Sequence, residues 1–169
     1  RKAGGEPVMW KTGHSLIKDK MKALKAPIAG EMSGHMFFTE GFYGHDDALY
    51  AAARLLRIVA DAKRPVKALL ADVPRFVSTP ELRVDCPDEL KEGIVADALA
   101  HFRAKYDVSD VDGVRILFGD GWGLIRSSNT QPILVLRFEA SSDARLAAIR
   151  AEVEGWLASR GVTLGGGGH

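Results

Sequence analysis

The sequence lacks most of the features that would mark a specialised class of protein. Its one cysteine, Cys86, cannot form an internal disulfide, which suits a reducing compartment and predicts a cytoplasmic location. No apolar run approaches the roughly 18 residues that a membrane-spanning helix needs. Neither sign of charge is in clear excess, because 23 Lys and Arg are matched by 22 Asp and Glu. These absences argue against a membrane protein and against a dedicated nucleic-acid binder, which usually carries a basic stripe.

What is present is the composition of an ordinary globular protein. Apolar residues make up 46% of the 169 residues and charged residues 27%, which is close to average. The length suffices for one ordinary domain or two small ones. Because the chain begins at Arg1, without a Met or a signal-like segment, we expect it to be a piece of a longer protein.

Residues 1–73 alternate short apolar segments with amphipathic ones, which predicts strands interleaved with helices in an α/β layer. The strand candidates include residues 7–10, and the second of two helices is expected to begin at Asp46 or Asp47. Apolar residues in that helix recur at steps of three and four, which predicts one buried face. Its members are Leu49, Ala52, Ala53, Leu56, Val59 and Ala60.

Prolines in this part of the sequence predict a domain boundary near residues 73–75. Residues 75–160 then show a different pattern of polar and apolar residues. Four strand-like segments and two amphipathic helices there predict an antiparallel sheet with two helices against one face. Asp120 and Gly121 predict a tight hairpin turn in which both residues have positive φ. The glycine-rich residues 161–169 should form a flexible tail.

The most specific local feature is a polar hexapeptide between apolar segments, from Gly30 to His35. Its two glycines let the backbone turn and approach a ligand closely. The carboxylate of Glu31 accepts hydrogen bonds and the hydroxyl of Ser33 both donates and accepts them, which suits the hydroxyls of a sugar. The alternative is a surface turn whose Glu and His side chains simply face water.

A second candidate is the loop 126–132, which joins two predicted strands. Its small hydroxyl and amide residues can arrange successive backbone N–H groups around an anion, and Arg126 adds a charged fork matched to phosphate oxygens. The alternative is a hairpin loop whose Ser and Asn side chains bond their own backbone. No Gly-x-x-x-x-Gly-Lys motif occurs in the sequence, which excludes a nucleotide-binding loop of that type.

A third candidate, residues 11–15, lies at a predicted helix N-terminus with Thr12 as a possible cap. Helix N-termini attract anions, and Lys11 together with a cationic His14 would strengthen that attraction. In isolation, a simple cap beside an exposed histidine is the better explanation. A zinc triad of His14, Glu31 and His35 is a further alternative, although no close His-x-x-x-His pair supports it.

Three long motifs occur in order along the chain: VMWKTGHSLIK at 8–18, GEMSGHMFF at 30–38 and GWGLIRSSNTQPILVLRFEA at 121–140. Together they resemble the C-terminal half of the bacterial phosphomannomutase/phosphoglucomutases, in the α-D-phosphohexomutase superfamily. The resemblance runs from about Glu6 to Gly161. Met32 favours the mannose/glucose branch, because phosphoglucosamine mutases of this family typically have Gln at that position.

The resemblance implies that the chain is most of domain three, truncated at its start, followed by the TATA-binding-protein-like domain four. By that likeness, six residues of domain three contact the phosphosugar: Lys11, His14, Glu31, Ser33, His35 and Pro74. Among them, Glu31 and Ser33 would hold sugar hydroxyls, and His14 is the catalytic candidate as a proton shuttle. Four residues of domain four would hold the phosphate that is not transferred: Arg126, Ser128, Asn129 and Thr130.

The implied reaction moves a phosphoryl group between O1 and O6 of mannose or glucose through a hexose 1,6-bisphosphate, with a phosphoserine donor and Mg²⁺. Neither a Thr-Ala-Ser-His-Asn-Pro-like serine loop nor an Asp-Gly-Asp-Gly-Asp-like metal loop occurs here. We therefore expect no metal in this fragment, no mutase activity from it alone, and the enzyme's N-terminal domains as its partner. The alternatives are a phosphoglucosamine mutase, a non-catalytic phosphosugar-binding or structural module, and a metal-dependent hydrolase built on His14, Glu31 and His35.

Overall fold

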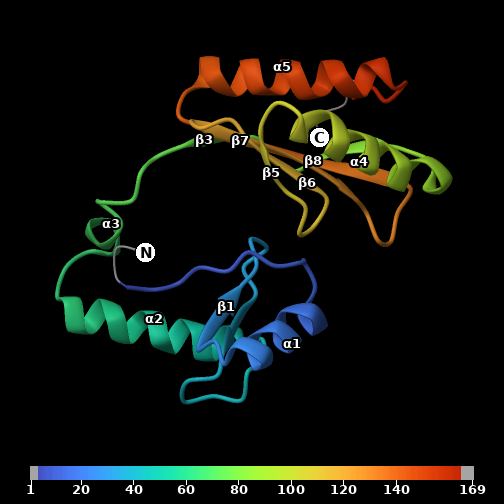
Figure 1. The fold of residues 1–169 in the computed structure, drawn as a ribbon. Coiled ribbons are helices and arrows are strands. Elements are labelled where there is room, and N and C mark those ends of the chain that lie inside the picture. Colours follow the sequence, from blue (N-terminus) through green and yellow to red (C-terminus); the bar gives the residue numbers. More distant parts are fainter. Residues whose placement is uncertain (1–3, 165–169) are drawn as a thin grey trace. The chain divides into compact units, whose positions relative to one another are not determined.

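The computed structural model describes residues 4–164 and divides the chain into two compact units between Pro74 and Arg75 (Figure 1). The first unit contains a two-stranded sheet and the second a six-stranded one. No helix among the described residues combines the length and the apolar character needed to cross a membrane.

The first unit is a short antiparallel hairpin with helices before and after it. Its elements are α1 (His14–Leu24), β1 (Ile28–Gly30), β2 (Met36–Phe38), α2 (Ala48–Ala62) and α3 (Val66–Leu69). Strands β1 and β2 pair with Gly30 opposite Met36, so the hairpin closes directly around the polar hexapeptide. Ile17 and Met21 of α1 pack against the fully buried Phe37 of β2 and form a small core.

The strand predicted over residues 7–10 is wrong. Apolar residues form a strand only where their backbone groups find partners, and no strand pairs with this segment in the part of the chain that the structure describes. Its apolar side chains are exposed, and Trp10 lies against the ammonium group of Lys20, 3.9 Å from the ring centroid. Helix α1 begins after Gly13, one residue later than a Thr12 cap would place it.

Helix α2 forms as predicted but does not bury the predicted face. Asp47 caps it by accepting a hydrogen bond from the Tyr50 N–H at 2.7 Å. The Tyr50 ring stacks on Phe42, with ring centroids 4.2 Å apart. On the predicted face, Leu49 is 84% exposed and Leu56 68%. Apolar spacing identifies which side of the helix is apolar, but the described part of the chain buries no residue of α2.

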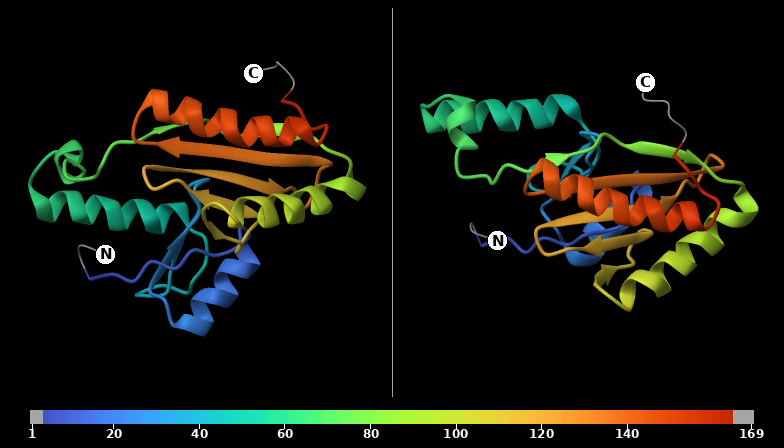
Figure 2. Two further views of the ribbon diagram at one scale, coloured as in Figure 1. Left: turned by 45° about the horizontal axis from the view of Figure 1, so that its top comes forward. Right: turned by 90° about the horizontal axis from the view of Figure 1, so that it is seen from above.

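The second unit is an antiparallel sheet with both of its helices on one face (Figures 1 and 2). Its elements are β3 (Val77–Ser78), β4 (Leu82–Asp85), α4 (Asp88–Arg103), β5 (Asp107–Ser109), β6 (Val114–Leu117), β7 (Gly121–Ser127), β8 (Ile133–Ala140) and α5 (Asp143–Ser159). The strand order is β3-β8-β7-β6-β5, and β4 also pairs with β8. This arrangement confirms the predicted sheet with two helices.

Alternate residues of the central strand β8 face the helices and form the core of the second unit. Leu134, Leu136 and Phe138 are fully buried, as a strand with one covered face requires. Beyond α5, Val162 is buried and Leu164 packs against the same core, so the packed structure continues past residue 160. Residues 165–169 of the predicted tail lie outside the described residues.

The hairpin between β6 and β7 turns one residue earlier than predicted. The Phe118 N–H donates to the Gly121 carbonyl oxygen at 2.9 Å, so Gly119 and Asp120 form the central pair. Of these two only Gly119 has a positive φ, +83°, and Gly121 does not. Glycine at the first central position is the requirement of a type II′ turn. The prediction of positive φ at Asp120 and Gly121 is therefore wrong.

Candidate functional site

The hexapeptide forms a tight turn that begins where β1 ends. Gly34 adopts a φ of +97°, which favours glycine. Its N–H donates to the Glu31 carbonyl oxygen at 3.0 Å, and the Glu31 N–H donates to the His35 carbonyl oxygen at 2.9 Å. The Ser33 hydroxyl lies 3.5 Å from Oε2 of Glu31. The turn is thus closed by its own backbone, and its polar side chains are left to project from it.

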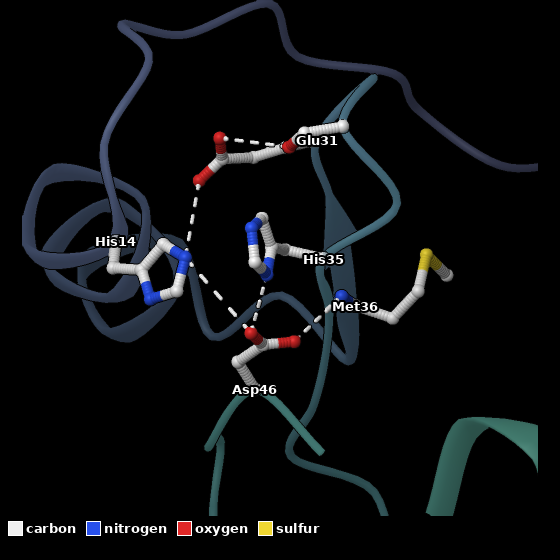
Figure 3. A network of polar contacts seen from close by, with 6 residues as sticks. His14, Glu31, His35, Met36 and Asp46 are labelled. Carbon is white, nitrogen blue, oxygen red and sulfur yellow. Dashed lines mark hydrogen bonds and ion pairs between the residues drawn. The ribbon is translucent and has the colours of Figure 1, made fainter. Parts of the chain in front are cut away.

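Four side chains from three segments meet beside this turn, and we call them the polar cluster: His14, Glu31, His35 and Asp46 (Figure 3). His14 is the first residue of α1, and its Nε2 lies 3.9 Å from Oε1 of Glu31 and 3.9 Å from Oδ2 of Asp46. Nδ1 of His35 lies 2.5 Å from the same Oδ2. The structure therefore brings together three of the predicted site residues and one that was not predicted.

One oxygen of Glu31 has no donor. Its Oε1 is buried and lacks a hydrogen-bond partner within residues 4–164, although the side chain as a whole is 11% exposed. Its ion-pair contact, Nε2 of His14, is too distant at 3.9 Å for a hydrogen bond. A buried carboxylate oxygen usually has a donor, so this atom is suited to accept one from a ligand.

Asp46 was predicted only as one of two helix caps, and the cap is Asp47. Its Oδ1 accepts a hydrogen bond from the Met36 N–H at 3.1 Å, while Oδ2 contacts His35. Partial burial raises the pKa of Asp46, but hydrogen bonds from His35 and Met36 and the nearby imidazoles lower that pKa below its ordinary value on balance. Asp46 is therefore ionised at neutral pH.

The cluster contains a group of residues that can hold a metal ion. The ligand atoms of His14, His35 and Asp46 all lie within 4.8 Å of one another. The third member of this group is thus Asp46, whereas the zinc alternative had proposed Glu31. Two imidazoles suit zinc-like ions, whereas Mg²⁺ prefers a shell of oxygen ligands. This group does not fit the Mg²⁺ that the family resemblance implies, and no step of Mg²⁺ chemistry is assigned to it.

Two further predicted residues lie outside the polar cluster. Lys11 is exposed and precedes α1 by three residues. Pro74 is exposed and is the last residue of the first unit. Neither belongs to the hydrogen bonds and ion pairs that define the cluster.

The predicted phosphate loop connects β7 and β8 in the second unit. Arg126 is half-buried near the end of β7, and the side chains of Asn129 and Thr130 are exposed. Ser128 is 9% exposed, and its Oγ accepts hydrogen bonds from the N–H groups of Thr130 at 3.3 Å and Gln131 at 3.2 Å. Those two N–H groups are used within the loop, while the Ser128 hydroxyl keeps its proton to donate.

Lys91 supports this loop and was not predicted. It lies on α4, and its Nζ donates to the Ser128 carbonyl oxygen at 2.6 Å and to the Gln131 carbonyl oxygen at 3.3 Å. The same ammonium group pairs with Asp88 at 2.6 Å. The contact spans 37 residues of sequence, so no local pattern signals it.

Comparisons with known proteins agree with this architecture. Residues 1–76 match the model of phosphoglucomutase/phosphomannomutase α/β/α domain III, and residues 81–155 match that of the phosphoglucomutase/phosphomannomutase C-terminal domain. A phosphomannomutase/phosphoglucomutase of Pseudomonas putida is 50% identical over 149 residues, 87% of this chain and 32% of that protein. A phosphoglucomutase of Neisseria meningitidis serogroup A is 46% identical over 92% of this chain and 34% of its own length.

A solved structure shows the same fold. The crystal structure of a phosphoglucomutase/phosphomannomutase family protein from Burkholderia thailandensis has a TM-score of 0.79 and 48% identity, over 94% of this chain and 33% of that one. The chain thus spans about a third of the length of the relatives it matches. Two successive domain models and this fold agree, and the chain belongs to the phosphoglucomutase/phosphomannomutase family, matching its domain III and C-terminal domain.

Proposed function

We propose that the chain is the sugar- and phosphate-recognition part of a hexose-phosphate mutase that interconverts the 1-phospho and 6-phospho forms of mannose and glucose. The observation that carries the proposal is the buried Oε1 of Glu31, which has no donor among the described residues. Burying a carboxylate oxygen without a hydrogen bond is costly. A sugar hydroxyl is a donor of the right kind.

In the first unit, Glu31 and Ser33 hold sugar hydroxyls, with His35 beside them. His14 is the proton-shuttle candidate, because its ring is 47% exposed and its Nε2 lies 3.9 Å from the carboxylates on either side. A ligand hydroxyl can reach such a nitrogen. Lys11 and Pro74 are further substrate contacts.

In the second unit, the loop after β7 holds the phosphate that is not transferred. Arg126 supplies a permanent charge, and charge-assisted hydrogen bonds to phosphate are the strong ones. The exposed side chains of Asn129 and Thr130 and the hydroxyl proton of Ser128 supply further donors. Lys91 holds the carbonyl groups of this loop from α4, which supports a preformed shape.

Recognition of the sugar hydroxyls by the first unit and of the phosphate by the second suits a mutase, whose ligand must bind in two orientations. The site should then recognise what both orientations share, which is a distal phosphate and equatorial hydroxyls. It should ignore C2, the carbon at which mannose and glucose differ. Phosphoryl transfer depends mainly on positioning and charge neutralisation, and both recognition units serve positioning.

The remaining chemistry belongs to other parts of the enzyme. A phosphoserine donor, Mg²⁺ and a hexose 1,6-bisphosphate intermediate complete the proposed reaction, with the donor and the metal held by the N-terminal domains. The exposed apolar face of α2 supports the presence of such further domains, since Leu49 and Leu56 are suited to pack on further polypeptide. The fragment alone should therefore bind phosphosugars without converting them.

A metal-dependent activity at His14, His35 and Asp46 is the second candidate function. The observation that favours it is the closeness of the three ligand atoms, within 4.8 Å. Against it, two of the three residues, Asp46 and His35, already hydrogen-bond to each other. Zinc that copurifies with the chain in one-to-one ratio, and hydrolysis that a chelator abolishes, would favour this candidate over the mutase.

The proposed function is tested by titrating glucose 1-phosphate and mannose 1-phosphate into the 169-residue chain, followed by NMR. We expect dissociation constants on the order of millimolar, which correspond to about 4 kcal/mol. Glu31→Gln and Arg126→Ala should each weaken binding of both sugars by about tenfold. Glu92→Gln, a change on the exposed surface of α4, should leave both affinities unchanged.

Three results would contradict the proposal. One is the absence of saturable binding of either phosphosugar. Another is a tenfold or larger change in the mannose-to-glucose preference in Glu31→Gln, which would mean that Glu31 recognises C2. The third is turnover of glucose 1-phosphate by the chain, with its bisphosphate and Mg²⁺ present, above a no-protein control.

A further inference from the structure

The carboxylate of Asp46 joins three parts of the first unit. Oδ2 contacts Nδ1 of His35 at 2.5 Å and lies 3.9 Å from Nε2 of His14, and Oδ1 accepts the Met36 N–H at 3.1 Å. Both of its oxygens therefore have hydrogen-bond partners on the turn or on β2, whereas Oε1 of Glu31 has none among the described residues. A carboxylate so fully occupied is poorly placed to bind a ligand itself and well placed to hold its neighbours.

The backbone position of Asp46 is fixed by a bridge to β2 and by the start of α2 directly after it. Its backbone forms an antiparallel bridge with Phe37, which is fully buried in the core of the first unit. The next residue, Asp47, caps α2. The position of the Asp46 carboxylate is thus set by the fold, before any ligand is present, and its contact with His35 is preformed.

This contact determines which ring nitrogen of His35 carries the proton. A neutral imidazole has one N–H, and an ionised carboxylate can only accept a hydrogen bond. Nδ1 of His35 must therefore carry the proton, and Nε2 becomes the acceptor. The His14 ring packs edge-on against the His35 ring, with centroids 4.5 Å apart and planes at 70°, which opposes a ring flip. Figure 3 shows the second ring nitrogen of His35 on the side away from Asp46, toward Glu31.

We propose that Asp46 is a positioning residue that holds neutral His35 as the Nδ1–H tautomer and so presents Nε2 as a hydrogen-bond acceptor on the side of the ring toward Glu31 (Figure 3). Nε2 of His35 and Oε1 of Glu31 then offer two acceptors to the hydroxyl groups of one ligand, and the ligand class is a vicinal diol such as a hexose provides. The diol rests on the proposed function, whereas the tautomer does not.

The tautomer can be measured on the 169-residue chain labelled with ¹⁵N-histidine, through long-range ¹H–¹⁵N couplings. Spectra are taken at rising pH until the ring ¹⁵N shifts no longer change, so that the neutral form of the ring is the one observed. His35→Gln identifies the His35 signals by their loss. We expect the proton on Nδ1 in the unaltered chain.

Asp46→Asn should lose that preference. An amide in place of the carboxylate can donate its N–H₂ to Nδ1, which favours the Nε2–H tautomer instead. Asp46→Ala should give a mixture of the two tautomers. Asp47→Asn is the matched control: it alters the cap of α2, next to Asp46, and should keep His35 in the Nδ1–H form. A structural role alone would not reverse a tautomer.

Two outcomes overturn the proposal: an Nε2–H tautomer in the unaltered chain, or an unchanged Nδ1–H tautomer in Asp46→Asn. The first needs no variant, so the proposal can fail even where the variant does not fold. Mannose 1-phosphate is then added at a saturating concentration. A shift of the His35 Nε2 signal in the unaltered chain that is lost in Asp46→Asn supports the diol. Failure of the sugar to bind contradicts the proposed function while the tautomer result stands.

Discussion

At the residue scale, one imidazole lies between two carboxylates of different kind. Nε2 of His14 is 3.9 Å from Glu31 and 3.9 Å from Asp46. Asp46 has a donor for each oxygen, from His35 and the Met36 backbone, whereas Oε1 of Glu31 has none among the described residues. The fold thus satisfies both oxygens of one carboxylate and leaves one oxygen of the other without a donor in the described part of the chain.

The lowered pKa of Asp46 predicts a dependence of stability on acid. A carboxyl group whose pKa is lower in the folded chain contributes stability above its ordinary pKa, about 3.9, and that contribution disappears as the pH falls below this value. Asp46→Asn removes the titrating group. Thermal unfolding followed by circular dichroism from about pH 6 down to pH 2.5 should therefore show a shallower fall of Tm in this variant than in the unaltered chain. Parallel curves would contradict the assignment.

At the element scale, β6 and β7 approach each other closely because of a glycine that precedes β6. Gly113 has a φ of +77°, and a Cβ at this position would lie 2.4 Å from the Ile125 carbonyl oxygen and 2.9 Å from Cα of Arg126. Neither backbone atom can move without displacing β7. Gly113 therefore permits this close approach beside Arg126, the first residue of the loop predicted to hold phosphate.

Gly113→Ala should destabilise the second unit by more than about 1–2 kcal/mol, the ordinary cost of a left-handed residue, because the backbone contact adds to it. Gly93→Ala is the matched control: Gly93 lies within α4, and its Cβ would meet no atom within 4 Å. That change should stabilise the chain by about 0.5–1 kcal/mol. Urea unfolding measures both, and a Gly113→Ala chain as stable as the unaltered one would refute the role given to Gly113.

Both helices and the four longer strands of the second unit were predictable because their pattern and their partners lie in the same stretch of sequence. The short strands β3 and β5 were not predicted, since two or three residues are too few to show a pattern. In α5, Ile149, Val153 and Leu157 recur every four residues, as the buried face of an amphipathic helix requires, and all three are buried. The α2 pattern was equally clear, but a pattern cannot say what covers an apolar face, and Leu56 is exposed. The position of the hairpin turn was mispredicted for a different reason. Gly119 and Gly121 can each adopt the positive φ that such a turn needs, and Gly119 is the one that does.

The candidate site was predictable where its residues are neighbours in sequence. The turn around Glu31 and His35 stands out because glycines and polar groups interrupt apolar segments. Asp46 does not, because an Asp-Asp pair before a helix is equally typical of a cap, and its contact with His35 bridges 11 residues. Lys91 lies 37 residues from the loop that it supports. Such contacts follow from the folded chain rather than from local pattern.

At the scale of the whole molecule, the two units differ in the size of their cores. Within residues 4–164, sixteen buried residues form the core cluster of the second unit, whereas three form that of the first: Ile17, Met21 and Phe37. Buried apolar area is the main source of folding free energy. The sheets differ likewise, because six strands support one another in the second unit and two in the first. Isolated two-stranded hairpins are marginally stable in water.

This contrast predicts that the two units open with different free energies. Amide groups of β8 from Leu134 to Leu136 lie between β4 and β7 and under both helices, and should exchange only on global unfolding of their unit. Amide groups of β1 from Ile28 to Gly30 have β2 alone as their strand partner among the described residues, and should exchange faster. Native-state hydrogen exchange by NMR on the 169-residue chain measures both. Equal protection of the two strands would mean that the first unit is stabilised by something other than its core, and the small cluster around Phe37 would then not be what limits its stability.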